Sequence, residues 1–264
     1  MCLSGLLTEY NFTEHVASDI GIGQSYLPAD SYQTQDHLNF ISNWSEENLV
    51  KLNEAKCNFM VFTRSKEDFA TRLKVNNCKI DQVSVSKILG IWISEDLSWE
   101  RNTKEMCRKA YSRMSMLTKL KYVGVKTEDL IEIYTLFIRS ITEYCAVAFH
   151  SSLTVAQATD IERIQKTSLK VILGENYIDY PAALEMSGLQ TLHDRREKRC
   201  LDFALKSLKH PVNRRMFPFN SNLGGEGAEI RDRETFEVNF ARTEKYRMSA
   251  VPFCQRKLND YFKN

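Results

Sequence analysis

The spacing of apolar residues divides the chain into a short mixed region and a long helical one. Leu38, Ile41 and Trp44 recur at near-helical intervals, which predicts an amphipathic helix over residues 36–50. Shorter runs with β-type patterning follow and predict a small antiparallel sheet: 57–63, then 72–75 and 79–83 joined by a hairpin turn at Asn76-Asn77, then 85–93. Gly90 inside the last run indicates a bulge or a backbone that approaches another group closely.

From residue 99 to about residue 210 the apolar period is helical. Met106, Ala110 and Met114 form a stripe that predicts one helix ending near Gly124. Further helices are predicted from Thr127 to about Phe149, from Thr154 to Gly174, over 181–186 and over 191–209.

These patterns predict an α+β fold, with a small antiparallel sheet and one helix at the N-terminal side and a mostly α-helical bundle after it. Gly21, Gly23 and Pro28 accompany little periodicity in the first segment, which predicts irregular structure there. The expected division is therefore an irregular segment, an α+β subdomain, a helical domain, and a linker at 224–227 with a weakly helical aromatic tail: 1–35, 36–99, 100–215 and 216–264.

Charge is unevenly distributed along the 264 residues. The formal net charge is +2, but residues 1–60 hold eight acidic side chains against two lysines. The rest of the chain is therefore clearly basic, and a polyanionic partner is expected to contact that part.

The seven cysteines show no CxxC pair, and no histidine lies at zinc-finger spacing, so no metal site is expected. Free cysteines among apolar residues favour a reducing intracellular compartment, nuclear or cytoplasmic, over secretion. The most apolar stretch, 130–149, is interrupted by Glu132, Arg139 and Glu143. These charges indicate a buried helix rather than a membrane span.

Several short segments together resemble the C-terminal part of a reverse transcriptase from a non-LTR (LINE-type) retrotransposon. The stretch from Trp44 to Ile93 contains Leu-Asn-Glu-Ala-Lys at 52–56 before an apolar strand and Lys-Ile-Leu-Gly-Ile-Trp-Ile at 87–93 after a hairpin. Further segments of the resemblance follow at Phe137-Ile138-Arg139-Ser140, Glu143-Tyr144, 161–166, Leu173-Gly174, 188–192 and 194–196. The resemblance implies the end of a palm, a primer grip, and a thumb with a post-thumb region over roughly 36–215.

Polymerases of this type hold two Mg²⁺ ions with palm aspartates, of which two are adjacent. No Asp-Asp pair occurs in the 264 residues. Alignment of Thr13-Glu14 with a family threonine-glutamate places the pair on Thr8 and Glu9, so Glu9 is a vestigial candidate. Lys56 is a second one, because the family lysine after the Leu-Asn turn is a general acid near the triphosphate. No cofactor is expected, and Mg²⁺ would require the missing palm to be supplied by another chain.

The resemblance also implies two nucleic-acid contact regions. Leu89, Gly90 and Trp92 fall in the primer grip, where Trp92 would stack or act as a wedge, although a tryptophan in an apolar strand is also typical of a core. In the thumb, basic residues at i, i+3, i+7 spacing predict either phosphate-binding rows or a solvated basic face. They are Arg101, Lys104, Arg108, with Lys109 and Arg113, and then Arg163, Lys166, Lys170. A third row, Arg195, Arg196, Lys198, Arg199, has the alternative of pairing with Asp194 or Glu197.

Three functions stay open at the level of sequence. The first is a reverse transcriptase fragment without polymerase activity that binds RNA or an RNA/DNA duplex regardless of sequence. The second is a helical interaction scaffold, or an inert relic of a decayed element, with a protein partner at the exposed sheet or at the aromatic tail, Phe236, Phe240, Tyr246, Phe253, Tyr261 and Phe262. The third, an active polymerase, needs a complementing palm. The first function predicts one continuous basic face, and the second predicts scattered basic residues.

Overall fold

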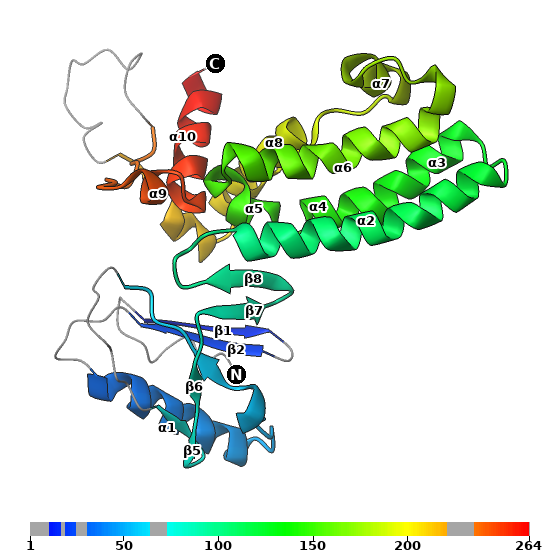
Figure 1. The fold of residues 1–264 in the computed structure, drawn as a ribbon. Helices are drawn as coiled ribbons and strands as arrows, with labels where there is room; N and C mark the ends of the chain where they lie inside the picture. Colours follow the sequence, from blue (N-terminus) through cyan, green and yellow to red (C-terminus); the bar gives the residue numbers. More distant parts are fainter. Residues whose placement is uncertain (1–10, 17–18, 25–30, 64–72, 221–234, 264) are drawn as a thin grey trace, which may run out of the picture. The chain divides into compact units, whose positions relative to one another are not determined.

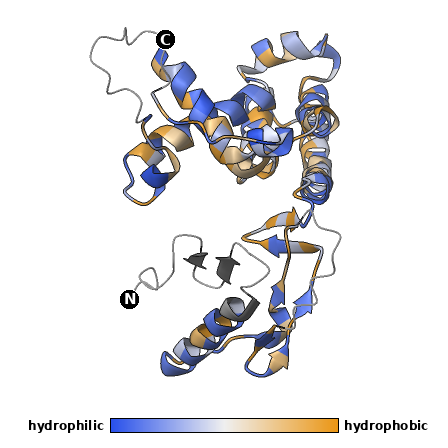
Figure 2. Cartoon of the chain, turned by 90° about the vertical axis from the view of Figure 1, so that its left-hand side faces the viewer, coloured by the Kyte–Doolittle hydropathy of each residue, from blue (hydrophilic) through white to orange (hydrophobic). Residues whose placement is uncertain are grey.

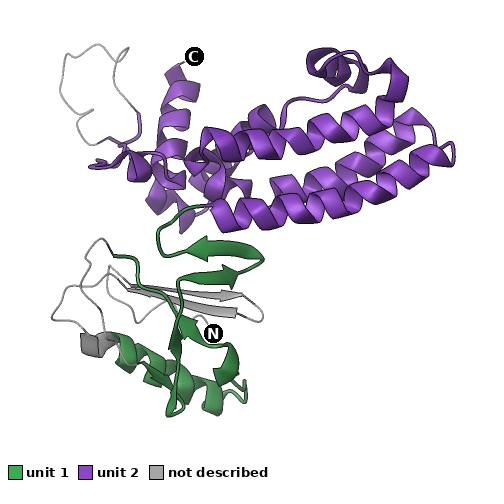
Figure 3. Cartoon of the chain, in the orientation of Figure 1, with its two compact units in different colours: residues 1–98 green, residues 99–264 purple. Residues whose placement is uncertain are grey.

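The computed structural model describes residues 11–16, 19–24, 31–63, 73–220 and 235–263 (Figure 1). The chain divides into two compact units, residues 1–98 and 99–264 (Figure 3). Short strands accompany one long helix in the first unit, and helices make up most of the second. The fold class is therefore α+β with a predominantly helical second part, as the periodicity predicts.

The first described elements are a hairpin and a helix. Strands β1 (Asn11–Val16) and β2 (Asp19–Gln24) pair antiparallel, and helix α1 follows over Ser31–Glu47. This corrects the irregular segment expected over 1–35. Glycines 21 and 23 lie within β2, paired with Glu14 and Phe12, and do not form a turn. Composition therefore misled the prediction, because backbone pairing along an edge tolerates glycine.

The rest of the first unit consists of very short strands. Their bounds, with a 3₁₀ turn η1 (Glu54–Lys56) before them, are β3 (Asn58–Phe59), β4 (Lys74–Val75), β5 (Cys78–Lys79) and β6 (Asp81–Gln82). The β4–β5 hairpin turns at Asn76 and Asn77 with φ of +49° and +63°, as the sequence predicts. β3 pairs with β6 in parallel, which corrects the purely antiparallel sheet. Alternation specifies the faces of a strand but not the direction of its neighbour.

Strands β7 (Val85–Ile88) and β8 (Ile91–Ser94) form a separate antiparallel hairpin. Leu89 and Gly90 are its two turn residues, with φ of +48° and +89°. One continuous strand over 85–93 was therefore a wrong prediction, and Gly90 is explained by a turn that requires positive φ. A small core of Leu73, Val75 and Ile80 belongs to this unit.

The second unit begins with helix α2 (Glu100–Tyr122), which packs along helix α6 (Val155–Leu173). Polar and apolar residues are interleaved around these helices (Figure 2). Their apolar stripes enter one buried cluster that contains Ala110, Leu117, Ile164 and Ile172. The predicted cap is confirmed: Thr154 Oγ1 accepts from Gln157 N (3.2 Å), and Gln157 Oε1 accepts from Thr154 N (2.9 Å), so α6 begins with a capping box.

The single helix expected over 127–149 is divided into several pieces. These are α3 (Thr127–Ile133), a π-helical segment η2 (Tyr134–Arg139), α4 (Ser140–Glu143) and α5 (Ala146–Phe149), followed by η3 (His150–Ser152). The break falls at Tyr144, which is extended, and Cys145, which has a φ of +52°. Neither residue is a glycine or proline, so the sequence holds no conventional signal for this break. None of the helices among the described residues has both the length and the apolar character needed to cross a membrane.

The remaining helices close the unit. They are α7 (Tyr180–Ser187), α8 (Leu192–Leu208), α9 (Glu244–Arg247) and α10 (Ala250–Lys263), with 3₁₀ turns η4 (Gly174–Asn176) and η5 (Asn213–Met216). The tail predicted as weakly helical contains α9 and α10, and α10 packs on α8 through a cluster that contains Cys200, Phe236, Cys254 and Leu258. Tertiary burial stabilises a helix whose sequence period alone is weak. Residues 224–227 lie outside the described residues.

Candidate nucleic-acid interface

Two of the predicted basic rows lie on the neighbouring helices α2 and α6. In α2, Met106, Ala110 and Leu117 are buried, and the residues at Arg101, Lys104 and Arg108 project from another face. In α6, burial of Ile161, Ile164 and Ile172 leaves an exposed row at i, i+3, i+7: Arg163, Lys166 and Lys170. The helical period therefore turns both rows toward solvent.

A groove between α2 and α6 brings together one residue from each row. Lys104 and Arg163 line the same cavity of about 310 Å³, with Tyr111 and Asp160 among its other residues. Burial raises the pKa of Tyr111, which also interacts with Thr167 of α6. Arg101 and Arg108 share the helical face of Lys104, and Lys166 and Lys170 share that of Arg163. Of the eight predicted phosphate contacts, Lys104 and Arg163 line the groove, together with the carboxylates of Glu100 and Asp160.

Ion pairs within each helix occupy part of this charge. Glu105 lies 3.4 Å from Arg101 and 3.0 Å from Arg108, and Asp160 lies 2.8 Å from Arg163. The hydrogen bond from Arg108 lowers the pKa of Glu105 and keeps its carboxylate ionised. Exposed pairs of this kind contribute little stability. Lys170 Nζ lies 5.4 Å from the centre of the Tyr177 ring.

Two further predicted contacts of α2, Lys109 and Arg113, do not line this groove either. Arg113 donates a hydrogen bond of 2.7 Å from Nη1 to the carbonyl oxygen of Phe137 in the π-helical segment. Lys109 is exposed, but the helical period turns it more than about a third of a turn away from Lys104. Arg113 is therefore in part an anchor for η2, and the expected set does not form one surface.

The primer-grip candidates all fall on the β7–β8 hairpin. Leu89 and Gly90 form its exposed turn, and Trp92 is half-buried opposite Lys87. Lys87 Nζ lies 6.0 Å from the centre of the Trp92 ring. The hairpin does bring the three residues together. The requirement for positive φ explains Gly90 without a phosphate.

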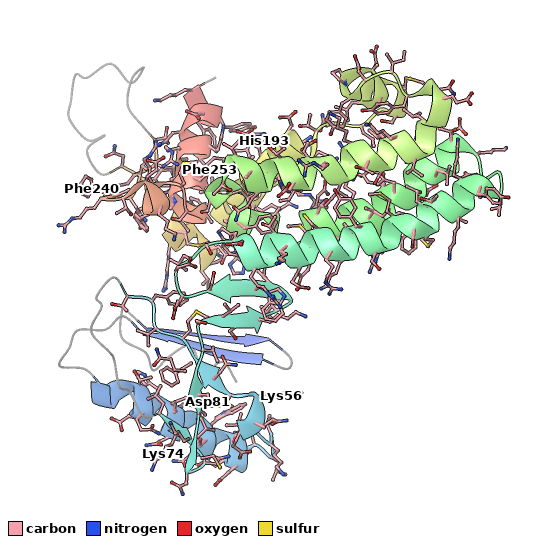
Figure 4. All side chains as sticks on the ribbon, viewed as in Figure 1. Lys56, Lys74, Asp81, His193, Phe240 and Phe253 are labelled. Atoms are coloured by element: carbon pink, nitrogen blue, oxygen red, sulfur yellow. The ribbon has the colours of Figure 1, made fainter. Side chains whose placement is uncertain are left out.

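The vestigial catalytic candidates do not form a centre among the described residues. Lys56 is exposed at the end of η1 (Figure 4), where the neighbouring Glu54 accepts a 2.8 Å hydrogen bond from Asn76 Nδ2. Glu9 lies outside the described residues. His193, Asp194 and Glu197 have potential ligand atoms within 4.8 Å of one another, but Glu197 is paired with Lys257. We therefore assign no metal role to this exposed group.

The third basic row has partners that the sequence did not indicate. Glu143 is buried and contacts Arg195, Arg199 and Arg139, so Arg195 pairs with α4 and not with Asp194 or Glu197. Burial would raise the pKa of Glu143, but the hydrogen bond from Arg195 and the surrounding cationic charges together lower it. Arg196 is fully buried, and its Nη atoms find no hydrogen-bond partner among the described residues. A charged residue within an apolar stretch, as Glu143 is, was the available signal for such a cluster.

The aromatic tail is also only partly accessible. Phe236 is buried and stacks at 5.1 Å on Phe219, and the half-buried Phe253 packs edge-on against His150 at 5.9 Å. Phe240, Tyr246, Tyr261 and Phe262 are exposed. A docking surface made of all six aromatics was therefore a wrong prediction, because two of them belong to the core.

Comparison of the chain with protein-family models, with curated proteins and with solved structures yields no match. The resemblance to non-LTR reverse transcriptases stays a prediction from the sequence segments that carry it.

Proposed function

We propose that this chain is related to the C-terminal part of a non-LTR reverse transcriptase and binds an RNA or RNA/DNA duplex through its phosphates, without sequence preference and without polymerase activity of its own. The observation that carries the proposal is that exposed cationic rows run along the neighbouring helices α2 and α6, and that one member of each row, Lys104 and Arg163, lines the same cavity. Two adjacent helices with parallel rows of cations fit the spaced phosphates of a duplex strand.

The mechanism of such binding is electrostatic. Lysine and arginine side chains that replace condensed counterions release them, so the binding constant falls steeply as the salt concentration rises. A-form geometry is recognised mainly through backbone and shape, so binding of this kind requires no base-specific contacts. Exposed pairs such as Arg163 with Asp160 can exchange for phosphate at small cost.

The second candidate function is an interaction scaffold. The separation of Arg113 from the groove and the exposure of Phe240, at 83%, favour it. A scaffold would tolerate neutralisation of the groove cations, whereas duplex binding would not.

The test is fluorescence anisotropy with a labelled RNA/DNA hybrid at two salt concentrations, for the full chain and for the variant R101A/K104A/R108A. We expect the variant to bind at least about tenfold more weakly at low salt and to reduce the salt slope by about two to three, one for each lost phosphate contact. The matched control is K109A/K119A, which removes two exposed charges of α2 outside this row.

Circular dichroism must show that the variants are folded. Absence of binding by the folded full chain, or an equal loss of affinity in K109A/K119A, would contradict duplex binding at this groove and leave the scaffold function.

A further inference from the structure

A second cavity, of about 430 Å³, lies between α8 and the break that follows α4. Its cationic lining is Arg195, Lys198, Arg199 and Lys206, and its apolar lining includes Val147 and Phe203. It shares no residue with the α2–α6 groove. Its volume falls within the range of small-molecule sites, roughly 300–1,000 Å³.

Helical spacing and the backbone break together build this cavity. Arg195, Lys198, Arg199 and Lys206 recur along one face of α8, while Cys200 and Ala204 on another face enter the core. The rest of the lining includes Cys145, Ala146 and Val147, which lie at and directly after the break at Tyr144 and Cys145. A continuous helix over 127–149 would not place these residues in the same way.

The cavity carries a surplus of positive charge that is held in place. Three guanidinium groups contact the buried carboxylate of Glu143. Arg199 Nη2 lies 2.7 Å from its Oε2, and Arg195 Nη2 donates a hydrogen bond of 3.2 Å to the same oxygen. Arg139 Nε lies 3.8 Å from Oε1. Among all the lining residues, four cationic side chains face two carboxylates, Glu143 and Asp202. The carboxylate of Glu143 is therefore already paired, and the lining residues Lys198 and Lys206 are exposed.

We propose that this cavity binds a nucleoside phosphate, with the phosphate at Lys198, Arg199 and Lys206 and the base against Val147 and Phe203. An inorganic anion would satisfy the cations but leave the apolar wall uncovered, and an apolar ligand would leave the cations without a counter-charge. Arginine held in place by a carboxylate is a preorganised phosphate donor, and an aromatic face accepts any base. The source is either a free mononucleotide or the terminal nucleotide of a strand, which share this chemistry.

The experiment is isothermal titration calorimetry of the full chain with adenosine monophosphate, adenosine, inorganic phosphate and a 5′-phosphorylated trinucleotide. The test variant is K198Q/K206Q, and the matched control is K126Q/K209Q, which neutralises two exposed lysines that do not line the cavity. We expect adenosine monophosphate to bind more tightly than adenosine or phosphate, with affinity reduced at least about fivefold in K198Q/K206Q and unchanged in the control.

The remaining outcomes either contradict part of the proposal or identify the source of the nucleotide. No binding of adenosine monophosphate, or equal affinity in K198Q/K206Q, overturns the site, and phosphate that binds as tightly as the nucleotide overturns the role of Val147 and Phe203. A trinucleotide that binds more tightly than the monophosphate, with loss in K198Q/K206Q, identifies a strand end as the source, and equal affinity identifies the free nucleotide. The hybrid-binding assay, repeated on K198Q/K206Q, distinguishes a failure of this site from a failure of duplex binding at the α2–α6 groove.

Discussion

At the scale of residues, the second unit contains ionisable groups that are buried in environments of very different charge. Glu143 is 6% exposed and surrounded by three arginines, whereas His150 is 7% exposed beside the buried Arg196, whose Nε lies 3.5 Å from His150 Nδ1. The carboxylate is stabilised in its charged form and the imidazole in its neutral form. The charged state of Glu143 and the neutral state of His150 should each have a measurable effect on the free energy of unfolding.

Glu143→Gln keeps the shape of the side chain but removes its charge. The arginines Arg195 and Arg199 are 26% and 50% exposed at their side chains, so water compensates part of the lost pairing. We expect a loss of about 2 kcal/mol in the free energy of unfolding, below the roughly 3–5 kcal/mol typical of a fully buried pair. Urea denaturation measures this loss, with Glu132→Gln at an exposed position of α3 as the control. Equal stability of the two variants would contradict a structural role for the cluster.

The burial of His150 predicts that the free energy of unfolding depends on pH between the pKa of this histidine in the folded chain and its pKa in the unfolded chain. Burial and the charge of Arg196 lower the pKa of His150 from the ordinary 6.5 to about 4, with further effects of His193, Glu197 and Lys257. The unfolded chain binds a proton below pH 6.5, while the folded chain does not until about pH 4. Stability is therefore complete above pH 6.5 and falls as the pH decreases toward 4, by on the order of 3 kcal/mol.

Replacement of this histidine by glutamine isolates its contribution. His150→Gln retains a hydrogen-bond acceptor but cannot titrate, so the decline in unfolding free energy between pH 6.5 and 4.5 should largely disappear. The exposed His210→Gln should keep it. An identical pH profile for His150→Gln and the unmodified protein would show that the imidazole is not responsible.

At the scale of elements, caps decide where the long helices begin. Thr154 satisfies the backbone N–H of Gln157, and α6 provides much of the main core through Ile164, Leu169 and Ile172. Thr154→Ala removes that acceptor, and we expect a loss of about 1 kcal/mol in urea denaturation. Thr159→Ala, on an exposed position of the same helix, should be close to neutral because alanine has the better helix propensity. A loss of equal size in both variants would mean that the cap is not responsible, because removal of a threonine side chain elsewhere in α6 would have the same effect.

The same elements show how far the sequence predicts the structure. Helices α2, α6 and α8 follow from apolar periodicity with local caps and stops, because every signal lies within the element itself. The break at Cys145 does not, since a non-glycine residue with positive φ is held there by its surroundings. The sequence predicts the cationic rows to which Lys104 and Arg163 belong. That these two side chains line the same cavity depends on tertiary packing. The pairing of Glu143 with Arg195, 52 residues apart, lies beyond any local pattern.

At the scale of the whole molecule, the distribution of buried apolar residues differs between the two units. The described part of the second unit, 99–264, contains three clusters of buried residues of its own, including Leu117, Ile161 and Leu258. The described part of the first unit contains one small cluster around Leu73, Val75 and Ile80. Burial of apolar area is the main favourable term in folding, so the two units should differ in their independent stability.

A fragment of residues 99–264 should therefore fold without residues 1–98, because its clusters are formed from its own helices. We expect a helical circular dichroism spectrum, a single cooperative urea transition, and a midpoint close to that of the main transition of the full chain. The fragment 1–98 is the comparison, and it should show no cooperative transition, since so small a core cannot offset the conformational entropy of folding. A fragment 99–264 that unfolds without cooperativity would show that its helices depend on the first unit. The compact unit defined by contacts would then not be a folding unit.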